Sequence, residues 1–289
     1  MRTEPTTSSR AGDPLPGAVV LFLSLAAALG MAGRIVGGRL AEEISWRGVL
    51  LVFAACCAVL AAACVSVLPN ARGVGGRGYF ETLRSLPGLF VQYTQLRVAA
   101  ISGAIWFFAF CAVWAGLAVA LWKPPFSYSA EQIGLYAAAG LSGVLATRVA
   151  GVWTDRVGSA RVILTGLALA GGAATLLVFM LTDTVVTLVC LALFDAGLFA
   201  AQVANQSTVL AIDSTAPARF NSAYMLVYFV GGSLGSAAGA ATVDWFGWAA
   251  TASLAAAAVG MAGMIVVITS LGAGTRRRQT TGTAATPVP

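Results

Sequence analysis

The sequence predicts an all-α polytopic membrane protein with eight transmembrane helices. Of its 289 residues, 58% are hydrophobic and only 10% are charged, whereas soluble domains carry about 25% charged residues. The apolar residues also fall into runs of about 20, the length that a helix needs to cross a bilayer. The basic residues behind the net charge of +6 lie in loops, so that charge does not indicate a nucleic-acid partner. We expect the lipid bilayer to be the main partner.

Eight apolar runs define the expected spans, and tryptophans lie near several of their ends, as is typical of the membrane interface. The expected spans are residues 17–38, 48–68, 98–122, 132–153, 162–182, 185–212, 220–243 and 246–271. The tryptophans are Trp46, Trp122, Trp153, Trp245 and Trp248.

The polar stretches between the spans define the domains. Residues 1–16 and 272–289 are polar and are expected to be disordered cytoplasmic ends. Residues 69–97 form a basic central loop, which divides the helix pair at 17–68 from six helices at 98–271. A cleavable secretory signal is the alternative for the N-terminal end, because Ala26, Ala27 and Ala28 imitate a cleavage site. Within the loop, alternating residues at 79–93 predict a short surface helix, interrupted at Pro87–Gly88.

The basic residues predict the orientation. Cytoplasmic loops of membrane proteins are enriched in Lys and Arg, and an even number of spans places both termini on one side. Only Arg39, Arg47 and Lys123 fall in loops on the opposite side. The residues on the side of the termini are Arg2, Arg10, Arg72, Arg77, Arg84, Arg97, Arg156, Arg161, Arg219, Arg276, Arg277 and Arg278. We therefore expect a multi-pass protein of the cell (inner) membrane with both termini in the cytoplasm.

The stretch from 151 to 161 is a polar connection between two expected spans. Gly151 would let two helices approach closely, Asp155 supplies a carboxylate, and Gly158 permits a tight turn. Arg156 and Arg161 place positive charge on the cytoplasmic side. An ordinary polar loop is the alternative interpretation.

Two stretches of the sequence repeat one pattern. Gly30, Gly33, Gly37, Glu42 and Trp46 each lie 202 positions before a matching residue. The matching residues are Gly232, Gly235, Gly239, Asp244 and Trp248. In both stretches a stripe of small residues ends a span, and an acid and a tryptophan follow. The offset corresponds to six helices, so the first helix pair matches the last.

The spacing Gly151-x-x-x-Asp155-Arg156-x-Gly158 resembles the signature loop of the major facilitator superfamily (MFS), although Ser159 and Ala160 replace basic positions and only Arg161 remains. The stretch Gly33-Arg34-Ile-Val-Gly37-Gly38 is similar to the fifth helix of drug and sugar efflux permeases, with Arg34 at a family proline. The resemblance implies two parallel six-helix halves, the proton-antiporter branch, and an N-terminally truncated chain that lacks the first four helices.

The resemblance also implies a conformational latch. In the family, the signature-loop carboxylate contacts the start of a later helix. Here that implies a contact from Asp155 to the helix near Phe220, or an ion pair with Arg219. Simple solvation of the loop is the alternative.

Asp195 is the strongest candidate for a functional side chain, because a carboxylate at bilayer depth is costly and usually marks a proton or substrate pathway. Gln202 and Gln206 share its helical face, and Asn205 is adjacent to that face. A structural hydrogen bond between helices is the alternative for this polar stripe.

Further candidates lie on other spans. Arg34 either pairs with a carboxylate in a cavity or extends to the interface. Trp106, Phe110 and Trp114 form an aromatic stripe that lines a cavity or packs in lipid. Tyr224 and Tyr228 share a face with the same two interpretations. Helix packing is expected at Gly33, Gly37, Gly231, Gly235 and Gly239.

The sequence predicts no catalytic residue, metal site or cofactor. It contains no histidine, and its five cysteines all lie in apolar runs. No pair of carboxylates shares a span, so an intramembrane enzyme is the weakest hypothesis. The leading hypothesis is a secondary active transporter, in which protons drive the efflux of a small molecule by alternating access. The alternative is a non-transporting remnant, or a half-transporter that needs a partner chain.

Overall fold

The computed structural model describes residues 15–67 and 79–282, and it describes side chains at residues 36–66 (except 38 and 42) and 84–271. The expected disorder of the ends therefore lies outside the described residues at 1–14 and 283–289. Residues 15–16 and 272–282 differ from the expectation, because α1 begins at Leu15 and α9 continues to Gly282. The polar residues that follow the last apolar span can still form the backbone hydrogen bonds of a helix.

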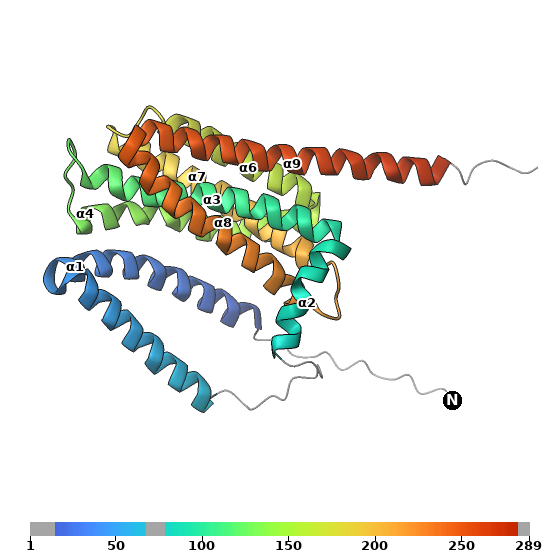
Figure 1. Ribbon diagram of the computed structural model, residues 1–289, viewed down its shortest axis with the longest axis horizontal. Helices are drawn as coiled ribbons and strands as arrows, with labels where there is room; N and C mark the ends of the chain where they lie inside the picture. Colours follow the sequence, from blue (N-terminus) through green and yellow to red (C-terminus); the bar gives the residue numbers. More distant parts are fainter. Residues whose placement is uncertain (1–14, 68–78, 283–289) are drawn as a thin grey trace, which may run out of the picture.

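Helices make up nearly all of the described chain (Figure 1). In chain order they are α1 (Leu15–Val67), α2 (Tyr79–Gln92), α3 (Thr94–Trp122), α4 (Ala130–Leu135), the 3₁₀ helix η1 (Tyr136–Gly140), α5 (Leu141–Val157), α6 (Ser159–Leu177), α7 (Thr184–Leu210), α8 (Pro217–Phe246) and α9 (Trp248–Gly282). The stretch α4–η1–α5 forms a single membrane-length segment.

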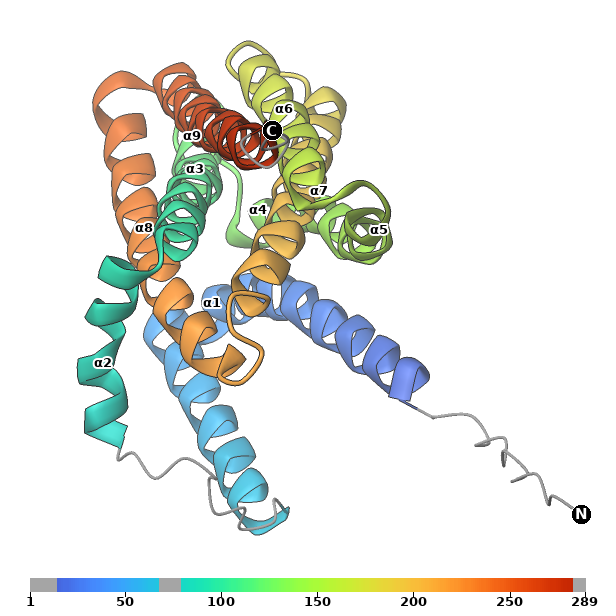
Figure 2. The same cartoon turned by 90° about the vertical axis from the view of Figure 1, so that its right-hand side faces the viewer.

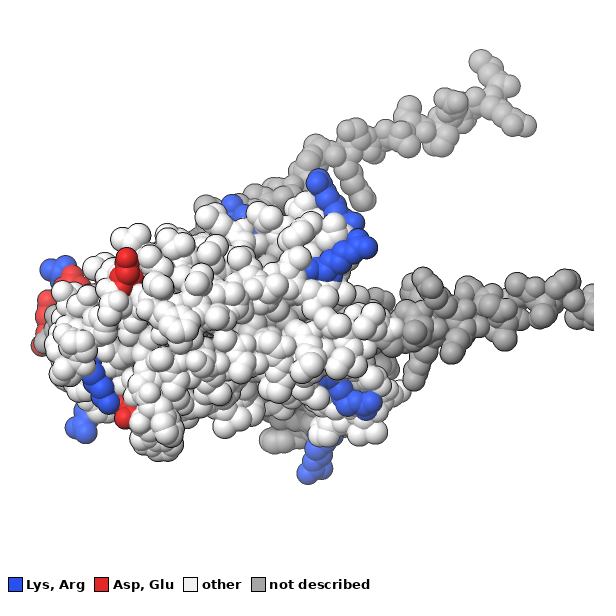
Figure 3. All heavy atoms as spheres, turned by 90° about the horizontal axis from the view of Figure 1, so that it is seen from above, with Lys and Arg blue, Asp and Glu red and all other residues white. Residues whose placement is uncertain are grey.

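Seven helical segments within the described residues are long and apolar enough to cross a membrane. Together with the all-helical architecture, they confirm the predicted fold class, although the count of eight is approximate. The first expected span, 17–38, lies within α1, but most of its side chains are outside the described residues. Charged side chains gather at the two ends of the molecule, and the face between them is uncharged (Figure 3), as a bilayer-spanning protein requires.

α1 consists of two helical arms joined at Ser45, whose backbone φ is 65°. The two arms diverge from this bend toward the end of the molecule at which α2 lies (Figures 1 and 2). Among the described residues, α1 contacts α4, η1 and α5. The described part of the molecule therefore has a compact group, α3 to α9, and a hairpin attached at one end.

The compact group is held by very close helix pairs. α3 packs most extensively on α8, and α6 packs on α7. A Cβ added at Gly231, Gly235 or Gly239 of α8 would lie 2.3, 2.2 and 2.2 Å from backbone oxygens of α3. These three glycines therefore lie directly against the backbone of α3. At Gly37, by contrast, an added Cβ would lie at an ordinary van der Waals distance of 3.7 Å from the ring of Phe53. The surroundings of Gly33 are outside the described residues.

α2 is the predicted surface helix of the central loop. It continues through Pro87, so the expected interruption there is wrong. Leu86 and Leu89, on either side of that proline, are 5% and 3% exposed and belong to the main apolar core. Their burial offsets the backbone hydrogen bond that proline removes.

Candidate functional site

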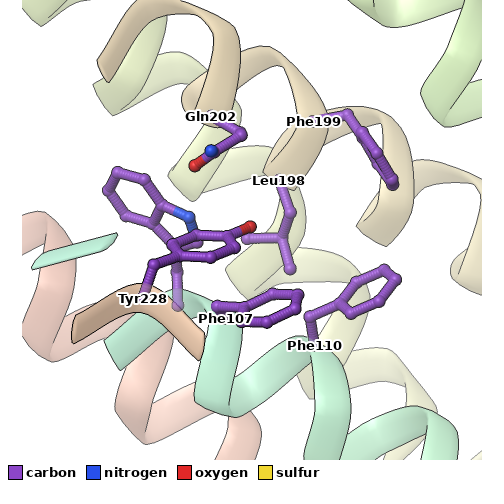
Figure 4. A pocket seen from close by; sticks show the side chains of 7 residues that line it. Phe107, Phe110, Leu198, Phe199, Gln202 and Tyr228 are labelled. Carbon is purple, nitrogen blue, oxygen red and sulfur yellow. The ribbon is translucent and has the colours of Figure 1, made fainter. Parts of the chain in front are cut away.

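A pocket of about 80 Å³ lies between α3, α7 and α8 (Figure 4). In this conformation the volume is smaller than the roughly 300–1,000 Å³ of most small-molecule sites. The lining is aromatic except for one leucine and one amide: Trp106, Phe107, Phe110, Leu198, Phe199, Gln202 and Tyr228. The structure thus brings together four residues predicted for the pathway, namely Trp106, Phe110, Gln202 and Tyr228.

The aromatic rings contact one another around this pocket. Phe107 of α3 stacks on Tyr228 of α8, with ring centroids 4.0 Å apart and planes 13° from parallel. Phe110 meets Phe199 of α7 edge to face, with centroids 5.8 Å apart. Pairs of this kind add about 0.5–1.5 kcal/mol beyond the burial of their area. The three helices are therefore connected to one another through the pocket wall.

A directed chain of hydrogen bonds runs beside the pocket. The Asn205 amide donates to the carbonyl oxygen of Ala99 over 2.9 Å and to the Tyr224 hydroxyl over 3.3 Å. The Tyr224 hydroxyl in turn donates to Oε1 of Gln202 over 2.6 Å. Because that oxygen is occupied, the Gln202 NH₂ group is left to donate toward the pocket. Tyr224 fits because Gly103 is opposite: a Cβ there would be 2.9 Å from its ring.

Asp195 lies one helical turn before Phe199 and is only 1% exposed. Its Oδ1 accepts a hydrogen bond from Nε1 of Trp114 over 3.2 Å. Its Oδ2 would lie 3.5 Å from a Cβ at Gly140, the last residue of η1. The carboxylate thus faces α3 and the junction of η1 and α5, directly behind the pocket wall.

The polar residues predicted to form one stripe on α7 each contact a different part of the structure. Asp195 bonds Trp114, Gln202 lines the pocket, and Gln206 donates to Asn221 of α8 over 2.9 Å. Asn205 is buried against α3 and α8. These residues share a helix face but do not form a continuous polar channel in this conformation.

The segment at 151–161 is helical except at Gly158, so the expected loop there is wrong. Gly158 has φ 88° and ends α5, and α6 begins at the next residue. A single residue reverses the chain because glycine tolerates this conformation. Gly151 has nothing within 4 Å of an added Cβ, so it does not bring two helices together. Asp155, Arg156 and Arg161 are exposed.

Arg219 contacts α2 rather than Asp155. Its Nε donates to the Ser85 hydroxyl over 3.1 Å. Asp155 and Arg219 do not form an ion pair among the described residues. In the nearby α7–α8 loop, the Thr215 hydroxyl and backbone N–H donate to Asp213 over 2.6 and 2.8 Å. These bonds lower the pKa of Asp213.

The side chain of Arg34 lies outside the described residues, so its two interpretations stay open. Among the described residues, no group of three or more Cys, Asp or Glu side chains could hold a metal ion. The sequence interpretation did not include Phe107 and Phe199 in the site. The four-residue spacing from Asp195 to Phe199 could have indicated the second of these, whereas no spacing signal distinguishes Phe107 from its neighbour Phe108.

The described chain is a bundle of membrane-length helices that encloses an aromatic pocket, and on the face in Figure 3 the charged side chains lie toward the two ends. These features define a multi-pass α-helical membrane protein. The chain is similar to a probable transporter of Streptomyces coelicolor, with 34% identity over 74% of this chain and 50% of the relative. It is also similar to an uncharacterized transporter, YgaY, of Escherichia coli O157:H7, with 30% identity over 82% of this chain and 60% of the relative. No family model matches the chain.

A crystal structure of a bacterial homologue of the iron transporter ferroportin, in an inward-facing state, has the same fold. Its TM-score is 0.60 at 16% identity, over 88% of this chain and 64% of that one. The chain thus shares its fold with that protein, and it spans between half and about two thirds of the proteins it matches.

Proposed function

We propose that the chain is a secondary active transporter of the MFS type, in which proton entry drives the efflux of a small molecule. One observation carries this proposal: an aromatic pocket lies beside a buried carboxylate, Asp195, which is one helical turn from the pocket residue Phe199. The names of the relatives as transporters support the general activity. The MFS assignment, the efflux direction and the proton coupling rest on the residues of the predicted motifs.

The geometry offers a route from proton to substrate. Trp114, which donates to Asp195, lies one turn after Phe110, and the two rings have centroids 6.4 Å apart. Asp195 lies one turn before Phe199, whose ring meets Phe110. Protonation removes the charge of Asp195 and weakens its hydrogen bond with Trp114. Such a change shifts the balance between two conformations of the pocket wall.

The position of α1 supports alternating access. α1 approaches α4 at the end where Arg39 and Glu131 lie 4.0 Å apart, and its arms diverge toward the other end (Figure 1). We propose that the diverging end is cytoplasmic, that the membrane is the inner membrane, and that residues 17–68 and 98–271 belong to the two halves. The repeat of the sequence supports this division.

Everted membrane vesicles test the proposal. Vesicles that contain the 289-residue chain and hold an acid interior are exposed to small aromatic compounds while a pH-sensitive dye reports the interior. The proposal predicts that at least one compound releases protons from these vesicles, with much less release from vesicles that contain Asp195→Asn. Equal release in both, or in vesicles without the protein, would exclude proton antiport through this site.

The second candidate is a half-transporter or non-transporting remnant that needs another chain. Two observations favour it: the chain spans 50% and 60% of the two relatives, and apolar side chains of α1, such as Leu51 and Val59, are 72% and 69% exposed. The same vesicle assay on a longer form, with four further spans before residue 17, distinguishes the candidates. Activity only in the longer form would favour the second.

A further inference from the structure

We propose that the aromatic pocket binds a flat, uncharged aromatic molecule that carries hydrogen-bond acceptors, such as carbonyl or ring oxygens. This inference rests on the proposed function only in taking the pocket as the substrate site. It is carried by the direction of the polar groups around the pocket, together with the shape that the rings leave.

The hydrogen-bond chain beside the pocket points donors inward. Asn205 donates to Tyr224, and Tyr224 donates to Gln202 Oε1. That order directs the Gln202 oxygen toward the protein and leaves its NH₂ group to donate to a ligand. In Figure 4 the Gln202 amide lies above the ring of Tyr228.

Trp106 and Tyr228 add further donors. Trp106 is 1% exposed, and its indole N–H is buried without a hydrogen bond of normal geometry, although it lies near the Tyr228 hydroxyl. If the indole N–H turns toward that hydroxyl, the hydroxyl hydrogen itself is left to donate. In either arrangement one donor of the pocket is left without a hydrogen bond of normal geometry, and a buried unpaired donor costs about 1–3 kcal/mol. A ligand that brings acceptor oxygens removes that cost.

The charge and the rings limit the rest of the ligand. No residue that lines the pocket is charged, and Asp195 lies behind the wall and bonds Trp114. N–H and O–H groups present their positive ends, which offsets the attraction of the aromatic ring faces for a cation. Phe107 already covers one face of Tyr228, and the rings of Phe107 and Phe110 lie 14° from parallel. A planar aromatic ligand can stack against rings of this kind.

Binding of three matched probes to the full 289-residue chain in detergent tests the inference. The probes are coumarin, which is planar with two acceptor oxygens; naphthalene, which has the same two-ring outline without them; and N-methylquinolinium, a cation of similar size. Quenching of tryptophan fluorescence and calorimetry report binding. We expect coumarin to bind roughly tenfold more tightly than either of the others, the effect of one or two hydrogen bonds.

Variants assign the difference to the named donors. In Gln202→Leu and Trp106→Phe, coumarin should lose its roughly tenfold advantage, while naphthalene binding persists and shows that the pocket is intact. The matched control Trp153→Phe changes an exposed tryptophan of α5 and should leave all three affinities unchanged. Equal binding of coumarin and naphthalene to the unaltered chain, or tighter binding of N-methylquinolinium, would overturn the inference. The proposed function has a separate test. If vesicles release no protons while coumarin still binds, the proposed function is wrong but this inference stands.

Discussion

Ser45 and Gly247 lie 202 positions apart and share one backbone conformation. Their φ and ψ angles are 65° and 159° at Ser45, and 82° and 176° at Gly247. Each residue joins a membrane-length helix to the next one. This region of φ and ψ is adopted almost only by glycine. The offset is the one found in the sequence repeat, so the matching turns support the proposal that the two helix pairs are copies of one unit.

The shared conformation predicts opposite effects of two substitutions. Ser45→Gly removes strain and should raise the free energy of unfolding by about 1 kcal/mol, whereas Gly247→Ala should lower it by about 1–3 kcal/mol. Thermal unfolding of the purified protein in detergent measures both. If Gly247→Ala unfolds at the temperature of the unaltered protein, the turn does not need glycine and the match with Ser45 has no structural meaning.

The contact between α3 and α8 predicts a strong effect at Gly235. A methyl group there would lie 2.2 Å from the backbone oxygen of Phe108, so Gly235→Ala must separate the two helices and should cost about 2–4 kcal/mol. Gly260 of α9 has nothing within 4 Å, and Gly260→Ala should be neutral or slightly stabilising. Unfolding midpoints that are the same for the two variants would contradict the observed packing.

The hydrogen bonds of Tyr224 predict a combined loss of stability and affinity. Tyr224→Phe leaves Oε1 of Gln202 without its donor at a buried site, which should cost about 1–3 kcal/mol. The freed Gln202 amide can then turn its oxygen toward the pocket, so coumarin affinity should also fall. Tyr93→Phe is the control, because the ring contact with Phe220 at 4.9 Å remains. Unchanged coumarin binding in Tyr224→Phe would show that Tyr224 does not orient Gln202.

The buried position of Asp195 predicts a change in pH dependence rather than a loss of folding. Asparagine keeps an oxygen that can accept the Trp114 N–H but carries no proton that titrates. Asp195→Asn should therefore fold with stability within about 1 kcal/mol of the unaltered chain or above it, and it should lose proton release. The control Asp183→Asn changes a carboxylate at the start of α7 that accepts from Val186 N over 3.1 Å. Proton release that Asp195→Asn retains at every pH would remove Asp195 from the mechanism.

The sequence predicted the spans well because apolar runs report directly on the cost of placing residues in lipid. It also predicted the α8 glycine surface, since small residues at four-residue spacing have few other uses in a membrane. It did not predict that Gly158 alone connects α5 to α6, because helical hydrogen bonding continues into polar residues beyond the apolar run.

The site was predicted only in part. Trp106, Phe110, Gln202 and Tyr228 follow from helical spacing on single spans, and the structure brings them together. Phe107 joins the pocket because α8 approaches α3 closely enough for Tyr228 to stack on it. The contact of Arg219 with Ser85 depends on where α2 docks. Such contacts between distant segments depend on the packing of helices, which the local pattern of one sequence does not specify.

The most direct test of transport asks whether the pocket opens to each side of the membrane in turn. Phe199→Cys, in a chain whose five cysteines are replaced by serine or alanine, is reconstituted into vesicles of known orientation and treated with a membrane-impermeant thiol reagent. We predict labelling from the side of the termini at one pH gradient and from the opposite side when the gradient is reversed. Labelling from one side only under both gradients, in a chain that still binds coumarin, would contradict alternating access.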